Sequence, residues 1–424
     1  MGKKLLLVGA MLASLTVALP GAFGKTAAPA STAGGEPGLT DRIITIGGTF
    51  PLSGPASRYA TIPAGMRAYF SYINASRGRP DRRRGVYGRQ IQFKFVDDQY
   101  NPAQTVQSTR QLVEQDRVFA TVGALGTEQQ QAVRQYMNQR KVPQLLVSTG
   151  ASTWGRDYKS SPYTFGWQPD YVSEGRLYGQ HIRATRPNAK IGILFQNDDY
   201  GKDYIEGLEQ GLGDRKDQII QRQGVEVTAA DSRSQVAQLR QAGVDTWAVF
   251  VTPTLTIGAL LVADALNWRP QIYLNSVSAV DSFMTVVTQR GGADAAEGLI
   301  STQYTKDPAN PKWVNDAGMQ LFKRLMAKYY PSGNINDGLA LYGMAKAHTF
   351  VQILQGAGAK PTRASVLRSA ARLNTTNNPF LLPGVRVRST ETDRFLISQQ
   401  TLTRFTGGIF QEFGRLTEGR PNGT

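Results

Sequence analysis

Strand-like and helix-like segments alternate along most of this chain, and this alternation constrains its fold more than any other feature. Residues 42–48, 90–98 and 118–123 have the apolar or period-two pattern of β-strands, and residues 62–76 and 101–116 between them have the pattern of helices. A helix between two strands returns the chain to begin a parallel neighbour. The series therefore predicts a parallel sheet with helices on both faces.

The alternation continues to residue 148 and then starts again. A helix at 129–139 and a strand at 143–148 complete the first series, and residues 164–169, with Gly and Pro, are typical of a crossover. The second series is predicted to contain helices at 172–186, 202–211, 234–242 and 256–267 and strands at 190–196, 218–223, 246–252 and 271–276. Because 424 residues are too many for one compact core, we predict two α/β units.

The last third of the chain is predicted to add helices and a hairpin. Residues 313–328 and 339–355 are strongly helical, and residues 377–384 have the Pro and Gly of another crossover. Residues 394–413 have the pattern of a β-hairpin with Gly407 and Gly408 at its turn.

The N-terminus has the features of a secretory signal peptide, predicted over residues 1–24. The basic pair Lys3-Lys4 precedes an apolar stretch, residues 5–19, that is too short to span a bilayer, and Ala22-Phe23-Gly24 offers small residues for cleavage before Lys25. A small-residue linker is predicted at 25–41. Because the chain has no cysteine, it is expected not to be a lipoprotein but a soluble protein of the periplasm or another exported location.

The charge balance is strongly basic. The formal net charge is +16, and loss of Lys3 and Lys4 with the predicted signal peptide leaves +14. A basic surface suits nucleic acid, but an export signal argues against that partner. The densest basic cluster, Arg77 to Arg89, is rich in Gly and Pro, so we interpret it as a solvated loop rather than a surface for an anionic partner.

No catalytic set is evident in the sequence. A serine nucleophile at Ser148 or Ser152 needs a base, and the only histidines, His181 and His348, lie in amphipathic helical segments, where we expect them on a helix surface or in packing. The Gly-x-Ser-x-Gly pattern fails because Trp154 stands where the second glycine is required. We therefore expect no enzyme activity.

Metal and phosphate sites are also not predicted. The acidic pairs Asp97-Asp98 and Asp198-Asp199 lack the spacing of metal ligands, and Asp98 is better explained as a cap. The phosphate-loop pattern Gly-x-x-x-x-Gly-Lys-Ser/Thr does not occur. No metal or cofactor is expected.

Two neighbouring strand ends carry the chemistry of recognition. Residues 145–154, LLVSTGASTW, run from an apolar strand into hydroxyls and backbone N–H groups, and residues 123–127, GALGT, end the preceding strand with Thr127 opening a helix. Ligands bind at the carboxyl ends of parallel strands, and such turns can hold a carboxylate without a counter-charge. Simple capping by Thr127 and Ser152 explains the same residues about equally well.

Seven motifs are spread along the chain: ITIGGTFPLSGPAS (44–57), GVYGRQIQFKFVDDQYNP (85–102), GALGT (123–127), VPQLLVSTGAS (142–152), FQNDDYGKDY (195–204), DAAEGLIST (294–302) and LLPGVRV (381–387). Together they resemble the periplasmic substrate-binding proteins of ABC importers in the leucine/isoleucine/valine-binding group, and the resemblance covers roughly residues 42–415. It implies a type I periplasmic binding fold, in which two doubly wound parallel-sheet lobes are joined by a three-segment hinge and close on a ligand.

The resemblance also implies lobe boundaries, with crossovers near Gly166, Gly298 and Pro383. Lobe 1 is expected to contain residues 42–165 plus 299–378, and lobe 2 residues 166–298 plus 379–424. Closure would bury the ligand and present a changed outer surface to the membrane permease. A monomer is the working expectation.

Positions that match the family's ligand site can be carried over one at a time. Thr127 matches a hydroxyl that holds the ligand carboxylate, Gly150 and Ser152 match groups at its polar head, and Tyr59 and Tyr200 match aromatic residues of the two lobes. Ordinary loop packing is the alternative for both tyrosines. The complete predicted ligand-binding set is Tyr59, Thr127, Gly150, Ala151, Ser152, Tyr200, Thr254 and Ser276.

One departure from the family pattern concerns the ligand. Amino-acid binders of this group have a glutamate where this chain has Ser276, and a buried ammonium without an acidic partner is costly. A small aromatic or organic acid or an amide is therefore as well supported as a branched-chain amino acid, unless Asp281 or Asp337 replaces the glutamate. The alternatives to an importer component are a ligand sensor that signals to a membrane receptor and, less well supported, an amidase.

Overall fold

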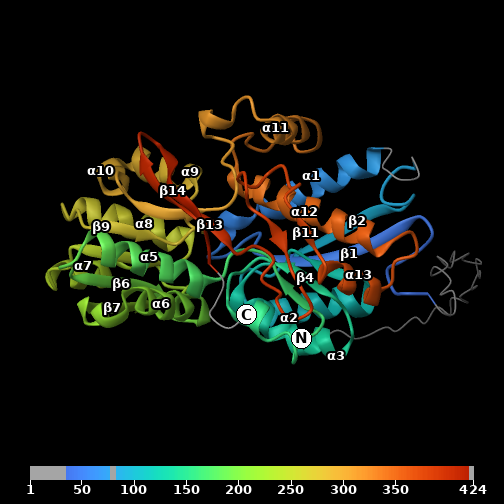
Figure 1. Cartoon of the computed structure of the whole chain (residues 1–424), viewed down its shortest axis with the longest axis horizontal. Coiled ribbons are helices and arrows are strands. Elements are labelled where there is room, and N and C mark those ends of the chain that lie inside the picture. The colour runs from blue at the N-terminus through green and yellow to red at the C-terminus, as the bar shows by residue number, and fades with distance from the viewer. Residues whose placement is uncertain (1–34, 77–82, 420–424) are drawn as a thin grey trace, which may run out of the picture. The chain divides into compact units, whose positions relative to one another are not determined.

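The described residues form two large β-sheets, each covered by helices, and a separate two-stranded pair (Figure 1). The computed structural model describes residues 35–76 and 83–419. The predicted signal peptide, most of the predicted linker and residues 77–82 of the basic cluster lie outside the described residues. No helix within the described part is long and apolar enough to cross a membrane.

The first sheet is entirely parallel, with the order β2-β1-β3-β4-β5. Its strands are β1 (Ile43–Phe50), β2 (Gln90–Asp97), β3 (Ala120–Val122), β4 (Gln144–Val147) and β5 (Thr164–Gly166). Each lies within or close to a predicted strand, except that β5 occupies part of the predicted crossover. A β-bulge interrupts the pairing of β4 with β5, where Leu146 has a φ of +55°.

Helices lie on both faces of the first sheet. The helix α1 (Ile62–Ala75) packs against α12 (Gly338–Ala357), and α2 (Pro102–Arg110) packs against α3 (Thr127–Gln139). The start of α2 follows its local sequence, because the Asn101 side chain accepts from the Ala103 N–H at 2.9 Å and Pro102 occupies the first position.

The second sheet has the order β14-β13-β10-β9-β8-β6-β7. Its strands are β6 (Ile191–Gln196), β7 (Ile219–Val225), β8 (Thr246–Phe250), β9 (Gln271–Leu274), β10 (Ile300–Gln303), β13 (Gln399–Thr406) and β14 (Ile409–Glu418). The strands β7, β6, β8, β9 and β10 are parallel to one another. The strands β13 and β14 form a hairpin that pairs antiparallel to β10 at one edge of the sheet. The predicted Gly-Gly turn is confirmed, since Gly407 and Gly408 both have positive φ.

Alternate side chains of the second sheet bury against different helices. Ala248 and Phe250 of β8 pack with α5 (Tyr171–Thr185) and α6 (Asp199–Leu212), whereas Trp247 and Val249 join α7 (Arg233–Gln241), α8 (Pro253–Ala265) and α9 (Asp281–Val287). This is the two-residue period of a strand buried on both faces.

Helices α5 and α6 approach each other unusually closely. A Cβ atom on Gly175 would lie 2.4 Å from the carbonyl oxygen of Tyr204, and one on Gly207 would lie 2.1 Å from that of Val172. Only glycine permits this separation of the two backbones. The shorter or more peripheral helices are α4 (Thr153–Arg156), α10 (Ala293–Ala296), α11 (Ala317–Tyr329) and α13 (Arg363–Ala370).

The chain passes between the sheets three times, but the second passage differs from the boundary expected at 299. The strand β10 pairs with β9 and β13, so residues 300–303 belong to the second sheet. The two sheets repeat the same strand order, because β7-β6-β8-β9-β10 of the second corresponds to β2-β1-β3-β4-β5 of the first. The strand β10 therefore occupies the position that β5 has in the first sheet. In both sheets the chain therefore leaves after the fifth parallel strand.

The third passage also differs from the crossover expected at 377–384. The strands β11 (Asn374–Thr375) and β12 (Val387–Arg388) pair with each other and hold this segment beside the first sheet's helices. The Asn378 amide donates to the Ala345 carbonyl of α12 at 2.8 Å, and Arg394 donates to the Pro162 carbonyl at 2.7 Å. The chain enters the second sheet only at β13, because these contacts hold the earlier residues in place.

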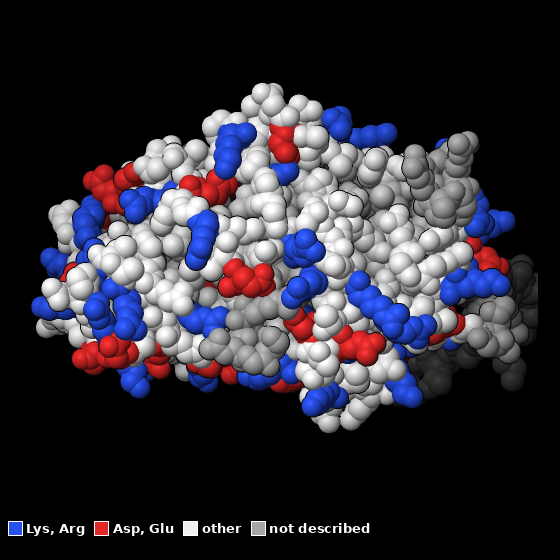
Figure 2. All heavy atoms as spheres, viewed as in Figure 1, with Lys and Arg blue, Asp and Glu red and all other residues white. Residues whose placement is uncertain are grey.

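Order also begins earlier than the predicted linker boundary at 41. Leu39 forms a bridge with Ile44, and the Arg363 N–H donates to the Glu36 carboxylate at 3.0 Å. Lysine and arginine side chains are interspersed with acidic ones over the face drawn in Figure 2. The positive charge is thus distributed on that face rather than gathered in one patch.

Candidate functional site

A cavity lies between the carboxyl ends of the two sheets. It contains about 870 Å³ of empty space, part of it open to solvent. The first sheet contributes the residues after β3 and β4, and the second contributes those after β8 and β9 and the end of β10. This position follows from parallel topology, because loops and helix N-termini gather at the carboxyl edge of such a sheet.

The first-sheet wall is a pair of hydroxyls at the start of a helix. The hydroxyl oxygens of Thr127 and Thr149 lie 2.6 Å apart, both buried and both in the cavity lining. Leu125 and Ser148 form a parallel bridge, which brings the two strand ends together. Thr127 begins α3, so the unpaired N–H groups and positive dipole end of that helix lie at this wall.

The second-sheet wall presents two buried hydroxyls, those of Thr252 and Tyr200. Thr252 occupies the N-cap position of α8, yet its hydroxyl makes no capping bond. Its oxygen and the Tyr200 hydroxyl are buried and have no hydrogen-bond partner among the described residues. Both residues line the cavity. Buried hydroxyls are nearly always paired, so these two are free to bind a ligand's polar atoms.

Aromatic rings form much of the lining. The rings of Tyr171 and Tyr200 meet edge to face, with centroids 5.1 Å apart. The Tyr59 hydroxyl donates to the Val277 carbonyl across the cavity at 3.3 Å. Burial raises the pKa of Tyr59 and Tyr200 well above the usual value, so both hydroxyls stay protonated. The six lining tyrosines are Tyr59, Tyr100, Tyr171, Tyr200, Tyr304 and Tyr342.

Comparison with known proteins decides the family. The profile of the periplasmic binding protein family matches residues 43–408, which is most of the chain. The chain belongs to the periplasmic binding proteins. Its relatives place it in the Leu/Ile/Val-binding group with the type I fold, as the sequence motifs predict.

The relatives are distant in sequence. A Leu/Ile/Val-binding protein homolog 1 from Brucella suis is 22% identical over 339 residues, covering 79% of this chain and 84% of the relative. A leucine-specific-binding protein from Salmonella typhimurium is 21% identical over 263 residues, covering 61% of this chain and 67% of the relative. These named proteins are binding proteins rather than enzymes.

Solved structures confirm the fold. A branched-chain amino acid ABC transporter from Thermus thermophilus with bound valine superposes with a TM-score of 0.76 at 18% identity, covering 90% of this chain and 97% of that one. A fatty acid ABC transporter substrate-binding protein from Thermomonospora curvata gives a TM-score of 0.72 at 20% identity, covering 90% and 94%. One of these proteins holds valine and the other is named for fatty acids, so the fold alone does not define a ligand.

The structure brings together four of the eight predicted ligand-binding residues of this binding protein. Tyr59, Thr127, Tyr200 and Ser276 line the cavity. The other four, Gly150, Ala151, Ser152 and Thr254, do not belong to its lining.

Gly150 and Ala151 turn away from the cavity toward the crossover. The Gly150 carbonyl accepts from the Tyr171 N–H at 2.7 Å, and a Cβ atom on Gly150 would lie 2.3 Å from the Pro169 carbonyl oxygen. Ala151 is buried in the core cluster of the second sheet. Glycine is required here for a close approach of two backbone segments rather than for contact with a ligand.

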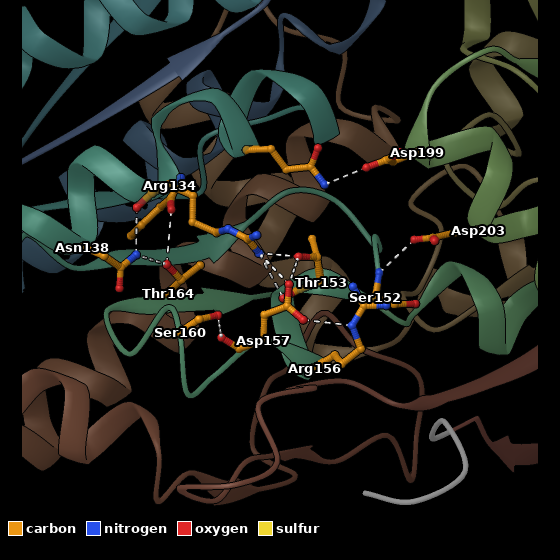
Figure 3. A network of polar contacts seen from close by, with 12 residues as sticks. Arg134, Asn138, Ser152, Thr153, Arg156, Asp157, Ser160, Thr164, Asp199 and Asp203 are labelled. Carbon is orange, nitrogen blue, oxygen red and sulfur yellow. Dashed lines mark hydrogen bonds and ion pairs between the residues drawn. The ribbon is translucent and has the colours of Figure 1, made fainter.

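Ser152 takes part in a polar network that joins the two sheets (Figure 3). Its backbone N–H donates to the Asp203 carboxylate of α6 at 2.9 Å, and its hydroxyl lies beside the Asp170 carboxylate. Burial raises the pKa of Asp203 to about 7. Behind Ser152, Arg134 contacts Thr153 and the Asp157 carboxylate.

Thr254 makes another contact between the two halves. Its hydroxyl donates to the Pro55 carbonyl at 3.0 Å, in the loop that follows β1. The contact is exposed and lies outside the cavity lining. Like Ser152, Thr254 links one sheet to the other rather than facing the cavity.

The premise that no acid stands near Ser276 is wrong. The Glu174 carboxylate of α5 accepts from the Ser276 N–H and from the Ser276 hydroxyl, both at 2.7 Å, and from the Tyr178 hydroxyl at 2.7 Å. Glu174 is 1% exposed and lies outside the cavity lining, and burial raises its pKa. The acid comes from a segment 102 residues earlier, so alignment at position 276 misses it.

A second acidic group lies at the cavity itself. Asp307 lines the cavity, and burial raises the pKa of its carboxyl and of the Asp281 carboxyl, which the negative charge of Asp307 raises further. Asp337, the other suggested replacement, caps α12 by accepting from the Leu339 N–H at 2.8 Å. Asp281 thus reaches the cavity through Asp307, which the sequence does not single out.

Sequence reasoning also misses several lining residues. Thr149 lies inside the quoted strand end, and its hydroxyl follows directly from that run of small polar residues. Thr252 carries a usable signal, because a Thr-Pro pair after a buried strand predicts a helix start at the carboxyl edge. Tyr304 and Tyr342 carry no such sequence signal, because they reach the cavity from distant segments of the chain.

Neither histidine serves a serine nucleophile. The His181 ring bonds the Tyr273 hydroxyl at 2.8 Å, and the His348 ring bonds the Tyr69 hydroxyl at 2.7 Å. Both therefore pack against tyrosines, as expected. Within the described residues, no group of three or more His, Asp or Glu side chains has the geometry of a metal site.

Proposed function

We propose that this protein captures a small carboxylate-bearing ligand in the cavity and delivers it to the permease of an ABC import system. The observation that carries the proposal is the cavity itself, to which both sheets contribute strand ends and in which the Tyr200 and Thr252 hydroxyls lack a partner among the described residues. A ligand's polar atoms would satisfy these buried hydroxyls.

Positive helix ends favour an anionic head group. Thr127 opens α3, Tyr200 lies in the first turn of α6, and Thr252 is the N-cap of α8, and all three line the cavity. The N-terminus of a helix offers free N–H groups and partial positive charge. The paired hydroxyls of Thr127 and Thr149 add short hydrogen bonds to the same wall.

The tyrosine rings favour a ligand with an apolar group next to its polar head. Tyrosine presents a broad apolar surface with a polar tip, so it suits an aromatic ring or a branched aliphatic group. The candidates are therefore a small aromatic acid, another small organic acid or amide, and a branched-chain amino acid, whose ammonium would bind near Asp307.

Lobe closure would follow the sheet assignments. We expect the first lobe to centre on the five-stranded sheet and the second on the seven-stranded sheet. The bonds from Ser152 to Asp203 and from Thr254 to Pro55 join the two and would form on closure. Import by an ABC system in the periplasm is supported by the predicted export signal and by the similarity to proteins of ABC transporters.

A melting screen tests the proposal. The chain beginning at Lys25 would be heated with leucine, valine, benzoate, benzamide and acetamide, and hits would be measured by calorimetry. A ligand at 100 times its Kd stabilises the folded state by about 2.7 kcal/mol, which raises the melting temperature by several degrees.

Site variants locate the binding. Tyr200→Phe removes only the hydroxyl and should weaken binding several-fold, whereas Tyr330→Phe, outside the cavity, should leave it unchanged. No melting shift with any compound of the panel would count against the proposed ligand classes. Equal binding by both variants and the parent would place the ligand elsewhere.

A further inference from the structure

Lys346 is a fully buried lysine behind the first-sheet wall. Its side chain is 0% exposed and is among the largest fully buried side chains of the described residues. Its ammonium nitrogen contacts the Ser148 hydroxyl and lies 3.2 Å from the Gly123 carbonyl oxygen. The Tyr342 ring centroid lies 4.3 Å from it, and that of Phe50 lies 5.9 Å from it.

Within residues 35–76 and 83–419, this lysine has no acidic partner. Among the described residues no carboxylate lies at ion-pair distance from Lys346, and its neighbours are Ser148, Gly123, Phe50 and Tyr342, of which only Tyr342 titrates. Tyr342 donates to the Gln168 side chain at 2.7 Å, and burial raises its pKa, so it stays neutral. Burial lowers the pKa of Lys346 well below its usual value, because an isolated charge is poorly solvated there.

The lysine is one side chain away from the cavity. Ser148 and Tyr342, which both contact its nitrogen, line the cavity, while Lys346 itself does not. The Ser148 hydroxyl donates to the Gly123 carbonyl at 2.7 Å and so accepts from the lysine. The next residue, Thr149, belongs to the hydroxyl pair of the wall.

We propose that Lys346 is the counter-charge for an anionic ligand head at the Thr127–Thr149 wall, and that it takes up a proton when the anion binds. This rests on the proposed function, which it deepens. The anion offsets the desolvation of the ammonium, so each stabilises the other across Ser148. The ammonium's third proton can face the Tyr342 ring.

Lys346 acts through Ser148 and through the electric field, so it is a positioning residue. The proposal predicts that carboxylates bind with net proton uptake at pH values where the lysine of the unliganded protein is neutral. Affinity for a carboxylate should then fall as the pH rises further. A neutral ligand of the same shape should show neither effect.

Calorimetry with benzoate and benzamide provides the test. Binding to the mature chain would be measured at pH 8 in two buffers with different ionisation enthalpies, for the parent and for Lys346→Met. We expect benzoate to take up a large fraction of about one proton in the parent and none in the variant. The variant should bind benzoate roughly 10- to 100-fold more weakly and benzamide unchanged.

The controls separate charge from structure. Lys360→Met, at an exposed position, should match the parent in both readouts. Lys346→Met replaces a buried amine by an apolar chain, so its melting temperature should not fall. Independently of any variant, benzoate binding to the parent without buffer dependence would overturn the proposal.

Two further outcomes would also overturn it. Equal loss of benzoate and benzamide binding in Lys346→Met would assign the lysine a structural role. Failure of benzoate, leucine and valine alike to bind the parent would remove the carboxylate for which Lys346 is the counter-charge and would count against the proposed function as well. Carboxylate binding without proton uptake would overturn only the role of Lys346 and leave the proposed function standing.

Discussion

The two walls of the cavity differ in what stands behind them. Behind the first-sheet wall lies the buried Lys346, whereas behind the second-sheet wall lie Glu174 and Asp281. The first wall's hydroxyls bond each other, while Thr252 and Tyr200 of the second have no partner among the described residues. We therefore expect an anionic head to turn toward the first sheet, where a protonated Lys346 would attract it, and away from the carboxyl groups behind the second wall.

Within the second wall, some groups support the fold and others are available to a ligand. Glu174 is fully engaged by Ser276 and Tyr178, so it fixes the second wall and is not itself a ligand group. Thr252 leaves its hydroxyl unused although it occupies a cap position. Stability and binding should therefore respond differently to substitutions on the two walls.

The largest expected effect is the loss of stability on removing Glu174, which holds Ser276 behind the second wall. Glu174→Ala should lower the free energy of unfolding by about 3 kcal/mol, because the Ser276 N–H and hydroxyl lose a buried acceptor and a void remains. Urea denaturation measures this loss. Glu114→Ala, which removes a glutamate from a surface pair with Arg140, should cost far less. Similar losses in both variants would contradict a supporting role for Glu174.

The next effect is on the hydroxyl pair of the first wall. Thr149→Val keeps the shape but removes the partner of Thr127, and it should weaken carboxylate binding by about 1.5–2.5 kcal/mol, roughly 10- to 70-fold. Calorimetry with the best acid from the screen measures it. Thr228→Val, at an exposed turn, is the control. Unchanged affinity in Thr149→Val would place the head group on the second wall instead.

A third effect is the pH dependence of stability that arises from the buried carboxyls of Asp281 and Asp307. Burial raises the pKa of Asp281 above its value in the unfolded chain, so the folded protein holds a proton that the unfolded chain releases. Stability should fall as the pH rises from about 4 until that proton is lost. Asp281→Asn should therefore raise stability by about 1–2 kcal/mol at pH 8 and little at pH 5.

Thermal melting at pH 5 and pH 8 measures this difference. The Asn side chain keeps the size of the carboxyl without its charge, and its oxygen can still accept from the Phe410 N–H. A variant that is destabilised equally at both pH values would show that the charge of Asp281 does not lower the stability of the folded protein.

The smallest effect concerns the unused hydroxyl. Thr252→Val removes a buried oxygen without a partner, so it should raise the free energy of unfolding by about 0.5–1 kcal/mol. The same change should weaken ligand binding several-fold. Melting temperature and affinity measured together would reveal opposite changes, and a loss in both would mean that the hydroxyl supports the fold.

Much of the fold is predictable because its signals are local. The alternating strands of both sheets, the Asn101-Pro102 helix start and the Gly407-Gly408 hairpin all follow from residues close in sequence. The passages after β10 and before β13 are not predictable in this way. They depend on which sheet edge is open to a strand and on side chains, such as Asn378, that bond distant helices.

The site residues likewise fall into those that local sequence predicts correctly and those that it does not. Thr127, Tyr59 and Tyr200 are foreseen from motifs and lie in the cavity, whereas Gly150, Ala151 and Ser152 do not line it. The bulge at Leu146 changes the direction of the strand end just before these residues, so strand alternation cannot assign their faces. Local pattern locates the loop but not the side of the loop that meets a ligand.

The sequence by itself therefore determined the α/β class, the two series of strands and the carboxyl-edge location of recognition, because these depend on periodicity and on chain direction. Only the tertiary structure decided that Glu174 supports Ser276 and that Lys346 stands behind Ser148. These pairs join segments 102 and 198 residues apart. Their energies arise from burial and from the exclusion of water, which no local pattern of residues encodes.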